Sequence, residues 1–268
     1  MTMRQLLVRP PAVAGAFYPA NPATLADALR SSFAAGVHPD GDEPAPKALV
    51  VPHAGYAYSG PVAASAYLRM VPARDEIRRV VLVGPSHHVA VDGIAVTSAG
   101  AFATPLGAVA VDDAARHIAL SHPEVRVDDA AHEFEHSLEV QLPFLQVVLE
   151  SFDVLPLAVG RCSASDAAAV LDTLWGGPET LLVASSDLSH YHRYADAAAL
   201  DARTATAIVA ADPDAIGDRD ACGAAGLRAL LTIAATRELR VEQLDLRNSG
   251  DTAGDKERVV GYGAFAIG

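Results

Sequence analysis

Short apolar runs alternate along the chain with longer segments whose apolar positions recur at helical spacing. The clearest run, residues 79–83, reads Arg-Val-Val-Leu-Val and is ended by Gly84 and Pro85. Apolar, β-branched runs of this length predict strands that are buried in the centre of a sheet. The other strands expected on this pattern are residues 47–51, 154–159, 180–185, 241–246 and 259–267.

The segments between these strands carry the spacing of helices. Asn21 and Pro22 resemble an N-cap followed by proline at the first helical position, and Leu25, Leu29 and Phe33 then share one face. Further helices are expected over residues 60–70, 113–122, 138–149, 164–175 and 195–211, and after the pair Cys222-Gly223.

This alternation of strands and helices predicts the α/β class. Residues 47–83 form a strand–helix–strand pattern, in which parallel strands are expected. Residues 93–97 and 108–111 are expected to form a hairpin appended to the sheet, with its turn near Thr104 and Pro105. The sequence shows no internal repeat and no linker, so residues 1–268 are expected to form a single domain.

The composition excludes several classes of protein. Of the 268 residues, 51% are hydrophobic and 20% are charged, which suits a large core and argues against disorder. The formal net charge of -13 repels phosphate backbones, so no nucleic-acid partner is expected. No apolar run is long enough for a membrane span, and no signal peptide is evident. Only Cys162 and Cys222 are cysteines, so a reducing, cytoplasmic location is expected.

Polar chemistry gathers where the expected strands end. His53 follows the strand at 47–51, and His87 and His88 follow the strand at 79–83. Asp187 and His190 follow the strand at 180–185 in the same way. Because parallel strands end at one edge of a sheet, where ligands bind in open α/β folds, these side chains are expected to converge.

Two helix starts add further chemistry. One carries Glu135, His136 and Ser137, and the other carries Cys222, where the helix dipole favours a thiolate. A thiolate with neutral imidazoles suits a borderline-soft divalent metal, and a nearby carboxylate can orient a ligand imidazole. Each of these residues taken alone is more commonly a hydrogen-bonding or packing residue. The convergence of three strand ends favours a metal site over that reading.

Six motifs carry a resemblance to a known family. AGAFYPA, VPHAGYAYSG, GPSHHV, EHSLEVQLPFL, SSDLSHY and ACG occur in this order from about residue 12 to the end of the chain. The sequence resembles the Memo family, which includes the AmmeMemoRadiSam system protein B members. That family is similar in fold to the class III extradiol dioxygenases, the LigB-like group. The resemblance implies a mostly parallel central sheet with helices on both faces and a site at one edge.

The resemblance also implies site residues. In Memo proteins the metal ligands are the histidine of HAGY, the first histidine of the SHH pair and the cysteine before glycine, here His53, His87 and Cys222. Asp187 and His190 of the SSDxxH pattern would lie beside them. The extradiol dioxygenases bind iron(II) through two histidines and a carboxylate, so the thiol of Cys222 is a departure. The resemblance in fold therefore does not imply dioxygenase activity. The family name AmmeMemoRadiSam implies a functional link to radical-SAM and AMMECR1-like proteins.

Two hypotheses about function follow. The first is a redox metalloenzyme with iron as the expected metal and copper or zinc as alternatives. In it His190 is the general acid or base, Asp187 sets the tautomer of His190, and His136 or His88 donates hydrogen bonds to the substrate. The second is a non-catalytic protein that binds a metal or a partner in the same pocket, and a zinc hydrolase is a weaker third alternative. The pairing of His190 with Asp187 favours an enzyme.

Overall fold

A computed structural model describes residues 7–41 and 43–268 of the chain. Within this part of the chain, nine strands form one central sheet in the order β10-β12-β2-β9-β3-β8-β4-β7, with β11 paired to β12. Their bounds are β2 (Ala48–Val51), β3 (Arg79–Pro85), β4 (Ile94–Val96), β7 (Val125–Val127), β8 (Asp153–Val159), β9 (Thr180–Ser185), β10 (His190–His192), β11 (Val241–Asn248) and β12 (Val259–Ile267).

The middle of the sheet is parallel. β2 and β3 each pair in parallel with β9, and β8 pairs in parallel with β3. Both margins are antiparallel, because β12 runs against β2 and β4 runs against β8. The predicted α/β class is confirmed, with a parallel centre inside a sheet that is mixed as a whole.

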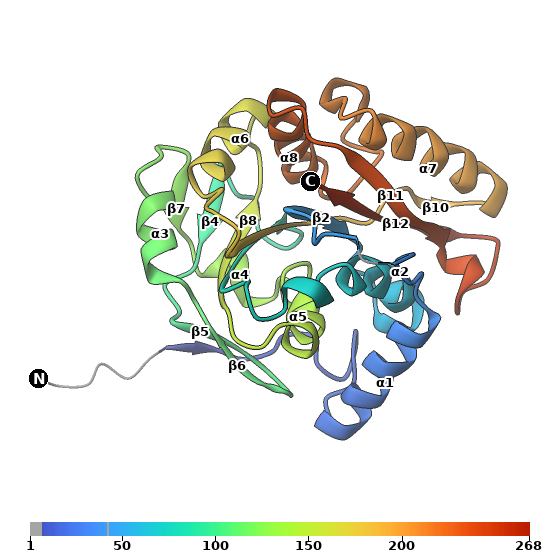
Figure 1. Cartoon of the computed structure of the whole chain (residues 1–268), viewed down its shortest axis with the longest axis horizontal. Helices are drawn as coiled ribbons and strands as arrows, with labels where there is room; N and C mark the ends of the chain where they lie inside the picture. The colour runs from blue at the N-terminus through green and yellow to red at the C-terminus, as the bar shows by residue number, and fades with distance from the viewer. Residues whose placement is uncertain (1–6, 42) are drawn as a thin grey trace, which may run out of the picture.

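Helices cover both faces of this sheet (Figure 1). They are α1 (Pro22–Ala35), α2 (Tyr56–Leu68), α3 (Asp113–Ala119), α4 (Ala130–Glu133), α5 (Leu142–Val148), α6 (Ala164–Thr173), α7 (Tyr194–Val209) and α8 (Ala224–Thr236). Short 3₁₀ helices span Val71–Ala73, Glu139–Gln141, Pro213–Ala215 and Ser249–Asp251.

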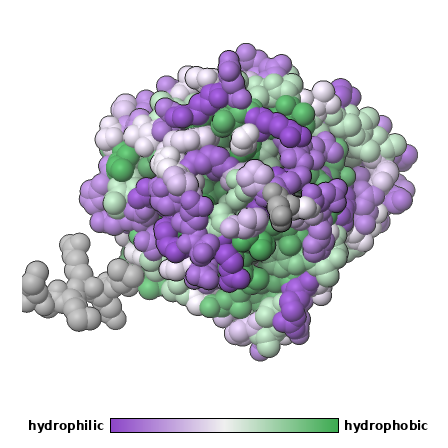
Figure 2. Space-filling view, viewed as in Figure 1, coloured by the Kyte–Doolittle hydropathy of each residue, from purple (hydrophilic) through white to green (hydrophobic). Residues whose placement is uncertain are grey.

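Successive residues of the central strands point into two separate cores. Along β3, Val80 and Leu82 belong to the core beneath α1, α2 and α5, whereas Val81 and Val83 belong to the core beneath α3, α6, α7 and α8. This alternation follows from the two-residue period of a strand, and it explains why the run is apolar at every position. Hydrophilic side chains cover much of the face shown in Figure 2.

Several expected elements differ from the structure. The helix expected over residues 138–149 is divided into the 3₁₀ helix Glu139–Gln141 and α5. α2 begins at Tyr56 rather than at Gly60, and Pro61 lies inside it. The proline is the sixth helical residue, so α2 lacks the hydrogen bond that an N–H at this position would donate to the carbonyl of Ala57.

The expected hairpin between residues 93–97 and 108–111 is wrong. Residues 94–96 instead join the central sheet as β4, which is buried at every position. The hairpin consists of β5 (Ala101–Thr104) and β6 (Gly107–Ala110), and with β1 (Val8–Arg9) it forms a separate three-stranded sheet. Gly107 permits the tight turn through its positive φ of 126°.

The segment before α1 is tied to the core by a buried ion pair. The Arg9 guanidinium lies 2.5 Å from a carboxylate oxygen of Glu139, and the two side chains are 6% and 0% exposed. Glu139 also accepts hydrogen bonds from the backbone N–H groups of Ala12 and Val13 and from the Tyr18 hydroxyl. A buried carboxylate such as that of Glu139 is strongly destabilising once its cation and its hydrogen-bond donors are removed.

Replacement of Arg9 by methionine is expected to lower the free energy of unfolding by about 3–5 kcal/mol, because Glu139 keeps its burial and loses its cation. Urea denaturation followed by circular dichroism measures this change. The matched control is Arg161→Met, since Arg161 is 87% exposed and pairs with Asp92 at 3.5 Å. That variant is expected to lose less than about 1 kcal/mol. Equal losses in the two variants would contradict the role of the buried pair.

No helix in residues 7–41 and 43–268 is both long enough and apolar enough to cross a membrane.

Candidate metal centre

His53 and His87 lie at the same edge of the sheet because the strands before them are parallel. Val51 at the end of β2 is level with Ser185 of β9, and Val83 of β3 is level with Ala184. The two imidazole rings are 5.3 Å apart between centroids and nearly perpendicular. Residues 34 positions apart in the sequence are thereby brought into contact distance, as the sequence predicted.

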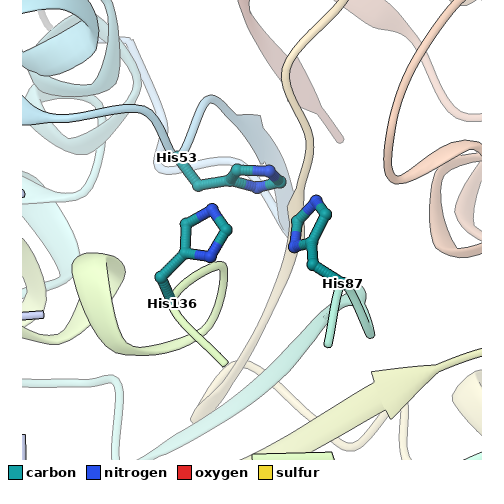
Figure 3. A group of neighbouring side chains, drawn as sticks. All are labelled: His53, His87 and His136. Carbon is teal, nitrogen blue, oxygen red and sulfur yellow. The ribbon is translucent and has the colours of Figure 1, made fainter. Parts of the chain in front are cut away.

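His136 completes a group of three imidazoles (Figure 3). It lies between α4 and the 3₁₀ helix Glu139–Gln141, and its ring centroid is 4.6 Å from that of His87 and 5.5 Å from that of His53. One nitrogen from each of the three rings lies within 4.8 Å of the other two, which is close enough to hold a metal ion. The sequence predicts a substrate-binding role for His136 and does not predict this grouping.

Hydrogen bonds fix the orientation of two of these rings. The Ser185 hydroxyl donates to the Ser137 carbonyl at 2.7 Å, so its oxygen accepts from His53 Nδ1 at 2.9 Å. His87 Nδ1 lies 2.9 Å from Oε1 of Glu135, a carboxylate that only accepts. Both rings therefore carry the proton on Nδ1 and leave the lone pair of Nε2 for a ligand.

Burial keeps two of the three imidazoles, those of His53 and His136, uncharged. It lowers the pKa of His53 well below the ordinary value, and it lowers the pKa of His136 to about 4. Burial alone would raise the pKa of Glu135, but the hydrogen bonds from His87 reverse this and hold that pKa at about 2. Neutral imidazoles next to an ionised carboxylate form the arrangement that metal sites use.

Cys222 stands next to this cluster, immediately before α8. Its Sγ is 3.1 Å from His53 Nε2, and the Asp187 backbone N–H donates to Sγ at 3.3 Å. The expectation that the helix start would favour a thiolate is wrong for the protein without metal. Burial raises the pKa of the Cys222 thiol to about 12, and the charge of Asp187 adds to this, so the helix dipole is outweighed.

Asp187 and His190 both face the site but do not pair with each other. Asp187 is 4% exposed and accepts a hydrogen bond from the His53 backbone N–H at 2.7 Å. His190 Nδ1 lies 2.8 Å from the Leu188 carbonyl. Among the described residues this is the only hydrogen bond of the ring, so Leu188 and not Asp187 sets the tautomer of His190.

Their environments shift both pKa values. Burial raises the pKa of Asp187 to about 7, although the hydrogen bond from His53 opposes this shift. Burial lowers the pKa of His190. The cavity is therefore lined by a carboxyl that titrates near neutral pH and by an imidazole that is neutral there.

A cavity of about 1190 Å³ opens over the cluster. His53, His87, His136 and Cys222 line it, as do the predicted residues Asp187 and His190. Aromatic side chains, including Phe17, Tyr58, Tyr191 and Tyr262, form part of the wall. Of the predicted residues, His88 alone is not among those that line this cavity, and with Glu135 and His136 it makes a second, more exposed group of possible ligands.

The donor set fits a metal ion. Two imidazoles present Nε2 lone pairs, their Nδ1 protons are already bound, and a third imidazole and a thiol are adjacent. Imidazole and thiolate donors suit iron, copper and zinc, and do not suit calcium or magnesium.

The residues that orient these donors were not predicted from the sequence. The pattern places Glu135 next to His136 and Ser185 at the end of a strand, and it assigns an orienting role to neither. A carboxylate directly before a histidine in the segment Glu135-His136-Ser137 was a usable signal for the first. Nothing in the sequence pointed to the hydroxyl of Ser185, because its contact depends on the pairing of β2 with β9.

Fold and site together define a class, an α/β protein with an imidazole cluster at the carboxyl ends of parallel strands. The profile of the family described as Memo-like protein matches residues 9–266. A MEMO1 family protein of Ignicoccus hospitalis is 35% identical over 285 residues, which cover 97% of this chain and 98% of the relative. Relatives of the same name from Aquifex aeolicus and Thermotoga maritima are 36% identical, and each match covers 95% of this chain and 97% of the relative.

The chain belongs to the Memo family, as its motifs indicated. The matches cover nearly all of the chain and nearly all of each relative, so the resemblance extends to the whole fold and not to one motif. The further likeness to extradiol dioxygenases is compatible with the α/β fold and stays a prediction.

Replacement of His53 or His87 by alanine is expected to reduce bound metal to background, because each removes a donor whose second nitrogen is already fixed. Elemental analysis after loading with ferrous iron under anaerobic conditions measures this. His117→Ala is the matched control, since His117 lies on α3 and its side chain is 71% exposed. Wild-type metal content in either of the first two variants would contradict the site.

Proposed function

We propose that this Memo-family protein is a redox metalloenzyme that holds iron on His53, His87 and Cys222. The observation that carries the proposal is the orientation of the donors, since Nε2 of each histidine keeps its lone pair while its Nδ1 is held by a hydrogen bond. The position of Sγ at 3.1 Å from His53 Nε2 supports Cys222 as the third ligand. A bound iron ion would supply one-electron redox chemistry and Lewis acidity at the floor of the cavity.

His136 is the competing third ligand, and a specific observation favours it. A nitrogen of His136 is grouped with those of His53 and His87 within 4.8 Å, and within the described residues the thiol of Cys222 is not part of that group. We favour Cys222 because of the family resemblance and its contact with His53. His136 then remains on the cavity wall, where a ring nitrogen can donate a hydrogen bond to an anionic group of the substrate.

Coordination by Cys222 can be detected from the number of protons released when metal binds. The thiol, whose pKa is raised to about 12, must lose its proton to bind metal, whereas His53 and His136 are already neutral near pH 8. Wild-type protein is therefore expected to release about one proton more per metal ion than Cys222→Ala. Calorimetric titration with zinc in buffers of different ionisation enthalpy measures the difference. Equal release in both proteins would assign the third position to His136.

His190 is the residue proposed for proton transfer. Its Nδ1 is held by the Leu188 carbonyl, so Nε2 is the nitrogen available to a bound substrate. Because its pKa is lowered, the ring is neutral at physiological pH and acts first as a base. Asp187, with its pKa raised to about 7, is placed to exchange a second proton. A protein that only binds metal needs neither group.

The variant His190→Ala is expected to keep the metal and to lose turnover by about 10²–10⁴-fold, the usual effect of removing a general acid or base. Metal analysis and oxygen uptake during an anaerobic-to-aerobic substrate screen give the two readouts. His122→Ala serves as the control, since His122 bonds to Thr173 on the exposed surface. Loss of metal in His190→Ala would make His190 a ligand. Unchanged metal and unchanged turnover would favour the non-catalytic binding protein.

A further inference from the structure

We propose that Glu135 is the positioning residue of the metal centre, and that its carboxylate holds His87 with the proton on Nδ1 so that Nε2 faces the cavity. The proposal rests on the proposed metal site and extends it to a residue that is not itself a ligand. Three observations support it. The Glu135 carboxylate accepts several hydrogen bonds, it also faces His136, and Arg9 holds the backbone around it.

The Glu135 carboxylate binds His87 at two points. Oε2 accepts from the His87 backbone N–H at 2.6 Å, and Oε1 lies 2.9 Å from His87 Nδ1. Oε1 also accepts from the backbone N–H of Ser137 at 2.8 Å. Because the backbone and the ring of His87 are bound by one rigid group, rotation of that ring about its side-chain bonds is restricted.

The same oxygen faces a second imidazole of the cluster. Oε1 of Glu135 lies 3.4 Å from His136 Nδ1, and the rings of His87 and His136 stack at 4.6 Å with an angle of 23°. One carboxylate, itself 1% exposed, therefore faces Nδ1 of two of the three clustered histidines. A carboxylate that orients metal ligands is expected to contact their imidazole rings in this way. A carboxylate that only stabilised a loop would not need to face two imidazoles.

The segment that carries Glu135 is itself held from outside the site. Arg9 donates to the Glu135 carbonyl at 2.7 Å and to the His132 carbonyl at 2.6 Å. The guanidinium of Arg9 thereby fixes the backbone of this segment, while the side chain of Glu135 points to the imidazoles. The carboxylate has a defined place before any metal arrives.

The substitution Glu135→Gln tests this with a side chain of the same size. The three groups that hydrogen-bond to the carboxylate all donate to it, namely two backbone N–H groups and the ring of His87. An amide carries one NH₂ group, which must face one of these donors. With the NH₂ group in place of Oε1, the ring of His87 can respond by moving its proton to Nε2, and that removes the lone pair that a metal needs. With the NH₂ group in place of Oε2, the hydrogen bond from the His87 backbone N–H is lost instead.

The experiment measures zinc affinity by competition with a chromophoric chelator, and separately records the histidine tautomers of the metal-free protein by long-range ¹H–¹⁵N NMR. Glu135→Gln is expected to weaken zinc binding by about 10–100-fold, the usual effect of losing such a partner. In the NMR spectrum the wild-type His87 ring is expected to carry its proton on Nδ1, and the variant ring to gain the Nε2–H form.

Glu139→Gln is the matched control. Glu139 lies in the same segment, is fully buried and also accepts several hydrogen bonds, but its partners are Arg9, Tyr18 and two backbone N–H groups rather than an imidazole. That variant is expected to lose stability in urea and to keep the zinc affinity and the His87 tautomer of the wild type. A purely structural role for Glu135 would instead make the two variants alike.

The outcomes separate this proposal from the metal site itself. Absence of zinc binding by the wild type would defeat the metal site, whereas the NMR tautomers would still decide the role of Glu135. Wild-type affinity in Glu135→Gln, or equal loss in both glutamine variants, would overturn the positioning role. If Glu135→Gln does not fold, the wild-type spectrum decides, because an Nε2–H ring at His87 contradicts the proposal.

Discussion

The parallel pairing of β2, β9 and β3 is the constraint on which the site depends. Each of the three strands is too short and too apolar to carry chemistry itself, but all three end at one edge of the sheet. The residues just beyond that edge, among them His53, His87 and Asp187, are thereby placed around one point although long stretches of sequence separate them. α2 and α8 then cover opposite faces, and the start of α8 brings Cys222 against His53.

Removal from water shapes the chemistry of that edge. An imidazole that binds metal must be neutral, and burial holds the pKa of both His53 and His136 low enough for this. The same desolvation raises the pKa of Asp187 and of Cys222, so that the thiol keeps its proton and Asp187 titrates near neutral pH, while the imidazoles of His53 and His136 are neutral. Glu135 is the exception, because its hydrogen bonds to His87 outweigh its burial and keep it ionised.

The sequence predicted the parts of the protein that depend on local pattern. The central strands, the helix after Asn21 and the convergence of His53 with His87 follow from apolar runs and from the parallel arrangement. Contacts that depend on tertiary pairing were not predictable, such as the Ser185 hydroxyl on His53 and the Leu188 carbonyl on His190. The protonation state of Cys222 was not predictable for the same reason. Its position at a helix start predicts a thiolate, but burial in the folded protein raises its pKa and favours the thiol. The misplaced hairpin arose because Ile94–Val96, an apolar run, fits a central strand as well as a hairpin arm.

X-ray absorption at the iron edge of the anaerobically loaded protein tests the central claim most directly, because it reports the atoms bound to the metal. The account predicts one sulfur at about 2.3 Å together with imidazole nitrogens at slightly shorter distance. The sulfur is expected to disappear in Cys222→Ala while the imidazole pattern remains. A spectrum with only light oxygen neighbours, or one that His53→Ala and His87→Ala leave unchanged, would contradict a metal centre at the ends of these strands.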